Sequence, residues 1–207
     1  MGRRKKEEPI IHQTRIAEEA IKLFAKNGIE NTKMDEIAAA AGYGKATLYV
    51  YFENKEDIVS FISYQSMSKL REAIETAMKE KLDTKALFFE ICKALTKLKE
   101  NYPAFFDRML QYIQVDTSND GKWLSKAYEE GEAVNNLLVK FIQGGINKKV
   151  FAPTDNYFET IMLMWAMISG VIKIAFEKEE YIKTDGKLSK EEFLNSGFEK
   201  IYLTIKA

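Results

Sequence analysis

Apolar residues recur every three or four positions along almost the whole chain, which is the pattern of amphipathic helices. The first such stretch predicts a helix over residues 10–26, because Asn27 and Gly28 supply a stop signal directly after it. Only three prolines and eleven glycines interrupt 207 residues, which is too few for a turn-rich β-sandwich. No alternating apolar and polar stretch competes with the helical spacing. The sequence therefore predicts an all-α protein.

Helix boundaries can be placed from capping and breaking residues. Two short helices are expected over 34–41 and 44–51, with Gly42 at the break between them. Asn54 is predicted to cap a long helix that begins at Lys55. The remaining helices are expected over residues 84–100, 103–114, 123–148, 155–179 and 189–206.

Composition excludes several classes of protein. A single cysteine, Cys92, cannot form an internal disulfide. Together with a single histidine, His12, it leaves no ligand set for a zinc finger and no Cys–His nucleophile, so no catalytic site, metal or cofactor is expected. His12 itself is expected at the surface or near a helix start. The net charge of zero indicates no partner by bulk electrostatics.

The chain is expected to stay in the cytoplasm and to have no partner membrane. Its longest uncharged apolar stretch, Thr160 to Ile172, is shorter than the roughly 18–20 residues that cross a bilayer. The first six residues, Met-Gly-Arg-Arg-Lys-Lys, lack the apolar segment of a secretory signal.

The most informative stretch is residues 28–58, where two short helices follow a full helix across a tight turn. This is the order of a three-helix helix-turn-helix unit. Thr32 is the expected N-cap of the first short helix, with Asp35 three residues later. Ile37, Leu48 and Phe52 are expected to form a small core. If these residues are buried, the second short helix must turn a different face outward.

That outward face carries residues suited to a DNA groove. Lys45 can donate to guanine, while the methyl groups of Ala46 and Thr47 can contact thymine. Nearby lysines, tyrosine hydroxyls and amides at helix N-termini can hold phosphates. The predicted DNA-binding residues are Thr32, Lys33, Tyr43, Gly44, Lys45, Ala46, Thr47, Tyr49, Tyr51 and Lys55.

Over residues 10–60 the chain resembles the DNA-binding domain of the TetR family of transcriptional regulators. The resemblance rests on the Ile-Ala and Ala-Gly elements, on Thr47-Leu-Tyr-Val-Tyr-Phe52 and on Asn54-Lys-Glu. Four positions depart from the family pattern, namely Lys33, Tyr43, Gly44 and Ala46. The loss of a serine hydroxyl at Gly44 removes a phosphate donor, for which Lys33 can compensate.

The resemblance implies a domain organisation and a set of partners. Residues 1–54, including a basic arm over 1–9, would bind DNA, and residues 55–207 would bind a small-molecule effector and dimerise. A homodimer paired through its last two helices would bind a palindromic operator on double-stranded DNA as a repressor.

The back two-thirds of the chain is rich in aromatic residues and methionines, which suits either a packed core or an apolar ligand cavity. Phe105, Met109 and Tyr112 share one helix face and are the first candidates for the cavity lining. Trp165 is the second choice as a lining residue of the cavity. An apolar or aromatic effector is therefore expected.

A carrier of apolar molecules and an enzyme are the two alternatives to a regulator. A helical carrier of an apolar molecule would contain the same cavity, with the N-terminal three helices serving only as a packing module. Salt-dependent DNA binding that is weakened by Tyr49→Ala or Lys55→Ala would distinguish the two. An enzyme is disfavoured, because the sequence contains no nucleophile–base pair and no metal-ligand spacing.

Overall fold

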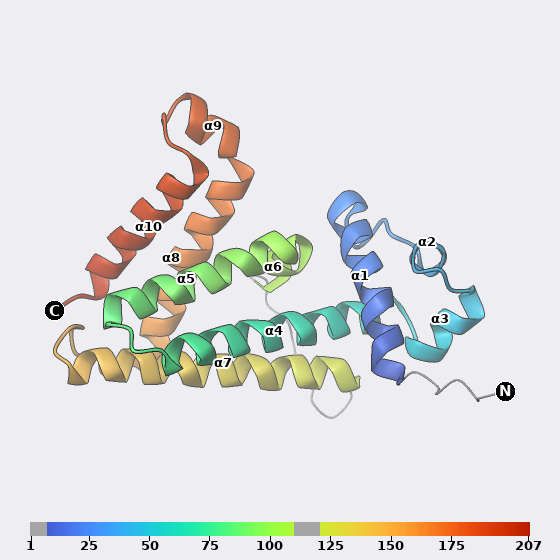
Figure 1. Ribbon diagram of the computed structural model, residues 1–207, viewed down its shortest axis with the longest axis horizontal. Helices are drawn as coiled ribbons and strands as arrows, with labels where there is room; N and C mark the ends of the chain where they lie inside the picture. The colour runs from blue at the N-terminus through green and yellow to red at the C-terminus, as the bar shows by residue number, and fades with distance from the viewer. Residues whose placement is uncertain (1–7, 110–120) are drawn as a thin grey trace. The chain divides into compact units, whose positions relative to one another are not determined.

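The computed structural model describes residues 8–109 and 121–207. These residues form ten α-helices, which confirms the all-α prediction (Figure 1). The helices are α1 (Pro9–Asn27), α2 (Met34–Ala40), α3 (Lys45–Tyr51), α4 (Lys55–Lys79), α5 (Thr84–Asn101), α6 (Pro103–Met109), α7 (Lys122–Asn147), α8 (Tyr157–Glu177), α9 (Glu179–Thr184) and α10 (Lys190–Ile205).

The cap predicted at Asn54 lies where the sequence placed it, and Ser189 caps the last helix. The side-chain oxygen of Asn54 accepts a hydrogen bond from the Asp57 amide at 2.9 Å, so α4 begins at Lys55. Ser189 accepts from the Glu192 amide at 3.1 Å, and the Glu192 carboxylate accepts in return from the Ser189 amide at 2.7 Å. Each pair satisfies amides that the first helical turn leaves without a partner.

One helix was missed. The sequence predicted a single helix over 155–179, but α8 ends at Glu177 and Lys178 leaves the helical region, with φ of −119° and ψ of 23°. The short α9 follows directly and buries Ile182. The helix expected over 103–114 is described only as far as Met109, and its remainder lies outside the described residues.

The chain divides into two compact units. Unit 1 contains residues up to Met67 together with Tyr102–Glu129, and unit 2 contains Ser68–Asn101 and Glu130–Ala207. Unit 1 extends past the predicted domain boundary at residue 54, because the first turns of α4 bury Ile58 and Phe61.

The core of unit 1 is built from the residues that the sequence predicted. Ile37 of α2 and Leu48 of α3 are fully buried, and Phe52 is nearly so. They pack with α1, whose Ile16 is also fully buried, while the Phe52 ring meets the Phe61 ring of α4 at 5.5 Å. This packing fixes which face of α3 points away from the protein.

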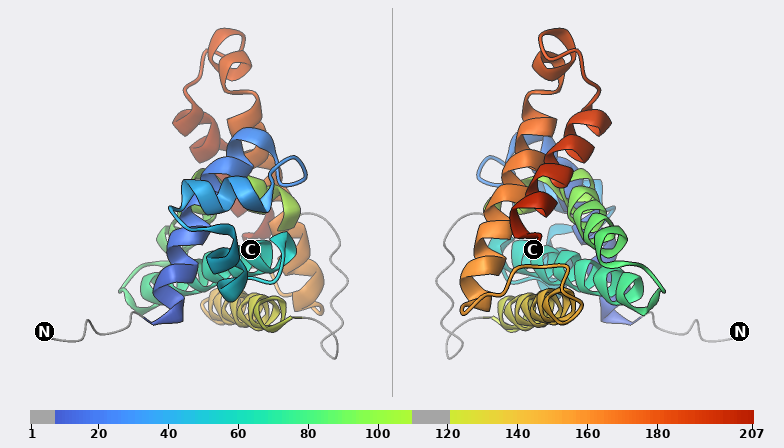
Figure 2. Two further views of the ribbon diagram at one scale, coloured as in Figure 1. Left: turned by 90° about the vertical axis from the view of Figure 1, so that its right-hand side faces the viewer. Right: turned by 90° about the vertical axis from the view of Figure 1, so that its left-hand side faces the viewer.

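In unit 2, α8 and α10 lie side by side along most of their length (Figure 2). The two helices approach closely at Gly197 of α10, where an added Cβ atom would lie 2.6 Å from Val171 of α8. At one end of this pair, an isolated antiparallel bridge joins Phe151 to Lys206.

Candidate functional site

The outward face of α3 is the centre of the candidate DNA-binding site. Four residues predicted to contact DNA, Lys45, Ala46, Thr47 and Tyr49, are all exposed on this short helix, and Tyr49 retains 45% of its accessible surface. The buried side chain of Leu48 holds the opposite side of the helix against the core. The site therefore follows directly from the packing of one leucine.

Val50 belongs to this face and was missed by the sequence prediction. It is 75% exposed, more than any other large apolar side chain of the described residues. Val50 follows Leu48 by two positions, which rotates it about 200° around the helix, and it lies one turn after Ala46. The helical spacing carried this signal, but an apolar side chain is easily assigned to the core. In a DNA groove, its methyl groups match the thymine methyl.

An ion pair connects Lys45 to α2. Its ammonium nitrogen lies 3.0 Å from one carboxylate oxygen of Asp35 and 3.1 Å from the other. The hydrogen bond and the charge of Asp35 raise the pKa of Lys45 above its ordinary value. Both side chains are 63% exposed, so the pair is open to water and to an approaching duplex.

Lys55, expected to bind a phosphate, instead binds the protein. Its ammonium group donates to the carbonyl oxygens of Ile29, Glu30 and Thr32 at 2.7, 2.9 and 3.2 Å. A lysine ammonium carries three N–H groups, and all three have acceptors in this loop. Lys55 therefore tethers the start of α4 to the loop before α2, and its phosphate contact stays a prediction.

Thr32 also has a different role from the one predicted. Its side chain is 1% exposed, and its hydroxyl donates to the Gly28 carbonyl at 2.8 Å. The N-cap position of α2 is Lys33, one residue later than expected. Glu36 rather than Asp35 therefore accepts from the N-cap amide, at 2.8 Å. The prediction of Thr32 as the cap is wrong. A phosphate contact through the backbone amides near Thr32 stays a prediction.

Tyr43 and Tyr51 form an aromatic cluster with the single histidine. The Tyr43 hydroxyl lies 2.7 Å from His12 Nδ1, and the His12 ring stacks on the Tyr51 ring at 4.9 Å. Gln13 on the same helix donates to the Tyr51 carbonyl at 3.1 Å. These half-buried tyrosines, predicted as DNA contacts, hold both ends of α3 against α1. His12 is therefore part of this clamp rather than a surface or capping residue.

Lys33 and Gly44 are exposed at the residues preceding α2 and α3. An added Cβ atom on Gly44 would meet nothing within 4 Å, so the backbone there is open to a large partner. Both positions remain predicted phosphate contacts.

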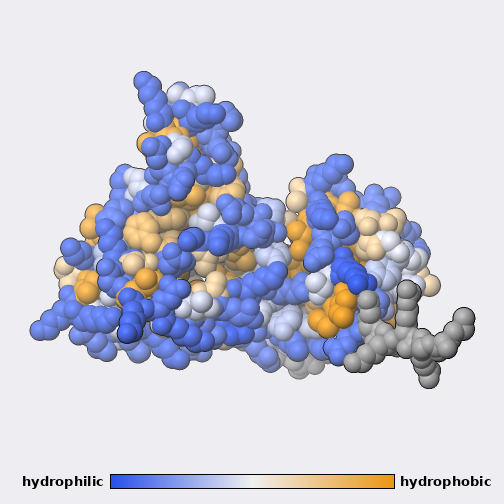
Figure 3. Space-filling view, in the orientation of Figure 1, coloured by the Kyte–Doolittle hydropathy of each residue, from blue (hydrophilic) through white to orange (hydrophobic). Residues whose placement is uncertain are grey.

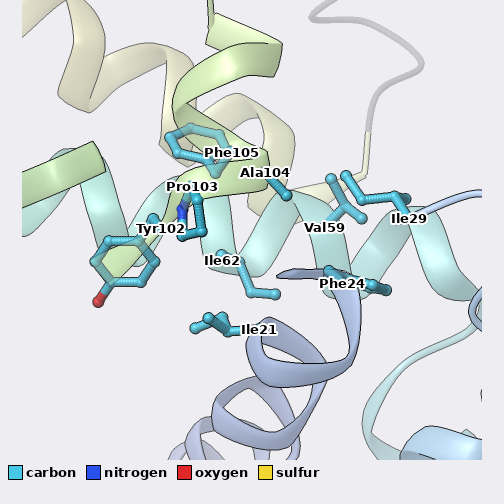
Figure 4. A pocket seen from close by; sticks show the side chains of 9 residues that line it. All are labelled: Ile21, Phe24, Ile29, Val59, Ile62, Tyr102, Pro103, Ala104 and Phe105. Atoms are coloured by element: carbon cyan, nitrogen blue, oxygen red, sulfur yellow. The ribbon is translucent and has the colours of Figure 1, made fainter. Parts of the chain in front are cut away.

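Two of the four residues predicted to line an effector cavity, Phe105 and Trp165, lie in separate pockets among the described residues. Phe105 lines a small apolar pocket of about 20 Å³ within unit 1, where α6 packs on α1 and α4 (Figure 4). Trp165 lines an apolar cavity of similar size in unit 2. Met109 is half-buried at the end of α6 and lines neither pocket, and Tyr112 lies outside the described residues.

The unit 2 cavity is lined by residues of α5, α7 and α8, and its described lining is entirely apolar. Besides Trp165, this lining comprises Ile91, Leu95, Leu138, Phe141, Ile142, Ile161, Met164 and Ile168. The sequence marked these positions as apolar, but helical spacing alone does not show which apolar faces meet.

Residues 16–60, which contain the whole outward face of α3, match the sequence model of bacterial regulatory proteins of the tetR family. This match assigns the N-terminal region, and not the whole chain, to the TetR family. The N-terminal helices are therefore a TetR-family helix-turn-helix domain, as the resemblance implied.

Known TetR-family proteins extend this likeness beyond the DNA-binding domain. The chain is 36% identical over 70 residues to the fatty acid metabolism regulator protein of Bacillus subtilis (strain 168). These 70 residues make up 34% of this chain and only 36% of that protein. It is 28% identical over 179 residues to an HTH-type transcriptional regulator of Staphylococcus aureus (strain USA300), covering 80% and 83% of the two chains. The crystal structure of the TetR-family regulator PfmR from Thermus thermophilus matches 91% of this chain and 97% of its own, with 27% identity and a TM-score of 0.69.

Proposed function

We propose that this chain is a homodimeric, ligand-responsive repressor whose α3 enters the major groove of a palindromic operator. The observation that carries this proposal is the exposed face of α3, where Lys45, Tyr49 and Val50 stand clear of a core anchored by Leu48. A face of this size and polarity, presented by a short helix on a rigid support, fits a B-DNA major groove.

On this face the contacts divide by chemistry. The methyl groups of Ala46 and Val50 meet thymine methyls, and Lys45 donates to guanine once its ion pair with Asp35 is shared or released. Lys33 and the backbone at Gly44 hold phosphates, which fix the position of the helix on the duplex. In a dimer the two copies of α3 would lie about 34–36 Å apart, one turn of DNA.

The dimer is supported by an unusually apolar outer face on α8. Leu163, Ala166, Gly170 and Ile174 share this face at helical spacing, and all four are exposed. Leu163 is 57% exposed and Ile174 48%. Figure 3 shows hydrophobic side chains at the surface of the region that contains α8 and α10. A second copy that covers this face accounts for surface that a monomeric soluble protein seldom exposes.

The same helix is long and apolar enough to cross a membrane by length and composition alone, with a third of the relevant window buried. Pairing with α8 and α10 of a second copy would explain this composition without a membrane.

The effector is assigned to the apolar cavity beside Trp165. Its described lining favours an apolar or aromatic molecule, in keeping with a relative whose name concerns fatty acid metabolism. The cavity now has room for about one water molecule, so a ligand must move the surrounding helices.

The effector acts by favouring a conformation that binds the operator less well. A coupling free energy of about 1–3 kcal/mol would weaken operator binding roughly 5–150-fold. Tyr102 alone separates α5, which lines the cavity, from α6, which packs on the DNA-binding helices of unit 1. The continuous helix α4 supplies a second connection between the units.

The test begins with selection of duplexes from a random pool by the purified protein. We expect a palindromic consensus, bound by a dimer and released by an apolar effector. A protein that binds apolar molecules but selects no duplex would instead be a carrier.

A further inference from the structure

Two voids within unit 2 share part of their walls. The first is the buried apolar cavity beside Trp165. The second is a surface pocket of about 370 Å³, formed by residues 151–154, the first turns of α8 and the end of α10. Ile142 and Met164 line both voids.

Met164 belongs to the wall that the two voids share. On α8, Thr160 lies one turn before it and lines the surface pocket, while Ile168 lies one turn after it and lines the buried cavity. Ile142 is branched and 2% exposed, which leaves it few alternative rotamers. Methionine is unbranched and rotates about three side-chain bonds, so Met164 is the part of the shared wall that can move aside.

The two voids differ in chemistry. The described lining of the cavity is wholly apolar, whereas the pocket adds the hydroxyls of Thr154, Thr160 and Thr204 to its apolar walls. The Thr160 hydroxyl donates to the Asn156 carbonyl at 3.0 Å, and the Thr204 hydroxyl donates to the Ile201 carbonyl at 2.7 Å. Thr160 Oγ1 also lies 2.9 Å from Thr154 Oγ1. Since a hydroxyl oxygen has two lone pairs, Thr160 and Thr204 can each still accept one hydrogen bond from a ligand. Among the described lining residues of the pocket, none is charged.

We propose that the effector is an elongated apolar molecule with a neutral hydrogen-bond donor at one end, such as an alcohol or amide. Its polar end lies in the threonine-lined pocket, and its tail passes Met164 into the buried cavity. This assignment rests on the proposed effector response. The pocket already has the volume of a small-molecule site, whereas the contracted cavity must expand around the tail.

Straight-chain alcohols from 1-hexanol to 1-decanol are suitable probes. The variant Trp123→Phe leaves Trp165 as the single tryptophan, so its fluorescence reports ligand in the cavity. We expect the dissociation constant to fall about fourfold for each added methylene, since each buried CH₂ contributes about 0.8 kcal/mol. We also expect decanoate, which places a charge among the threonines, to bind at least about tenfold more weakly than 1-decanol.

Substitutions test the route directly. Ala152→Trp fills the surface pocket without touching the cavity, and Asp155→Trp places the same bulk at a neighbouring exposed residue outside the pocket lining. We expect the first variant to weaken 1-decanol binding about tenfold or more and the second to leave it unchanged. Calorimetry measures both affinities, because each variant adds a tryptophan that would obscure the fluorescence of Trp165. Thr160→Val keeps the shape of the pocket but removes an acceptor, and should reduce the preference for 1-decanol over decane about fivefold.

Three results would overturn the proposal. The first is an alcohol affinity that does not change with the length of the alcohol, and the second is equal 1-decanol affinity in Ala152→Trp and Asp155→Trp. The third is no alcohol binding by the parent protein. If Ala152→Trp became monomeric but bound alcohols as before, the pocket would instead be part of the dimer interface. Operator binding measured on the same samples separates these failures from failure of the repressor function.

Discussion

Asp35 in the first turn of α2 holds Lys45 at the first position of α3, with the lysine nitrogen 3.0 and 3.1 Å from the two carboxylate oxygens. The ion pair fixes Lys45 beside the groove-facing residues but places a negative charge where phosphates must approach. Asp35 therefore positions Lys45, and in the proposed complex its charge would oppose DNA binding.

Replacing Asp35 by asparagine should strengthen operator binding about threefold to tenfold in dilute salt, because the change removes a negative charge and releases Lys45 for DNA. Fluorescence anisotropy with a labelled operator measures the effect. Asp155→Asn, an equal change of charge in unit 2, serves as the control and should bind as the parent does. Unchanged or weaker binding by Asp35→Asn would show that the positioning of Lys45 by Asp35 favours operator binding at least as much as the charge of Asp35 opposes it.

Replacing Lys55 by methionine should lower the free energy of unfolding by about 2 kcal/mol, since three carbonyl oxygens of the loop lose a charged donor. Urea unfolding followed by circular dichroism measures the loss. Lys33→Met, at an exposed position, should change stability by less than about 0.5 kcal/mol. If Lys55→Met were as stable as the parent but weaker on DNA, Lys55 would be a phosphate contact and not a tether.

Val50 should read thymine methyl groups. Replacing one operator thymine at a time by uracil removes only the methyl group, and at one position this should weaken binding by the parent protein by about 1 kcal/mol. Val50→Ala should be insensitive to the same change, and a double-mutant cycle compares the two losses. Equal losses in both proteins at every position would assign the methyl contact to another residue.

The outer face of α8 should hold the dimer together. Leu163→Glu combined with Ile174→Glu places two carboxylates on this face, and light scattering should then report a monomer with unchanged helical content. Lys97→Glu, at an exposed position on α5, should remain dimeric. A doubly substituted protein that stayed dimeric would place the interface elsewhere.

Burial raises the pKa of the Cys92 thiol, so the folded protein keeps it protonated where the unfolded chain, with an ordinary value of 9.0, ionises. The unfolded state then binds fewer protons, and stability should fall as the pH rises above about 9. Urea unfolding at several pH values tests this, and Cys92→Val should remove that part of the pH dependence. Rapid reaction of the native thiol with a disulfide reagent would contradict its burial.

Local signals predicted much of the fold. Asn54 and Ser189 are followed at the correct spacing by groups that complete their caps, and Ile37 and Leu48 can be buried together only if α3 turns its other face outward. The caps depend on residues within a few positions of one another, and Ile37 and Leu48 lie on two successive short helices. Helical spacing resolves contacts over such short distances in the sequence.

Contacts between distant segments could not be predicted in the same way. The partners of Lys55 are carbonyl oxygens of a loop more than twenty residues away, and their orientation depends on the backbone of that loop. Phe105 and Trp165 looked equivalent as apolar helical residues, yet they lie in different units. Spacing identifies an apolar face but does not identify the helix that covers it.

The central claim is that α3 enters a DNA groove, and the most direct measurement is the salt dependence of binding to a selected operator by the parent protein and by Tyr49→Ala. The account predicts that the parent loses at least about tenfold in affinity between 50 and 200 mM salt, as expected if Lys33 of each copy neutralises one phosphate. At one fixed salt concentration, Tyr49→Ala should bind markedly less tightly, while Tyr181→Ala, an exposed tyrosine on α9, should bind as the parent does. Binding that is independent of salt, or equal in the two tyrosine variants, would contradict the account.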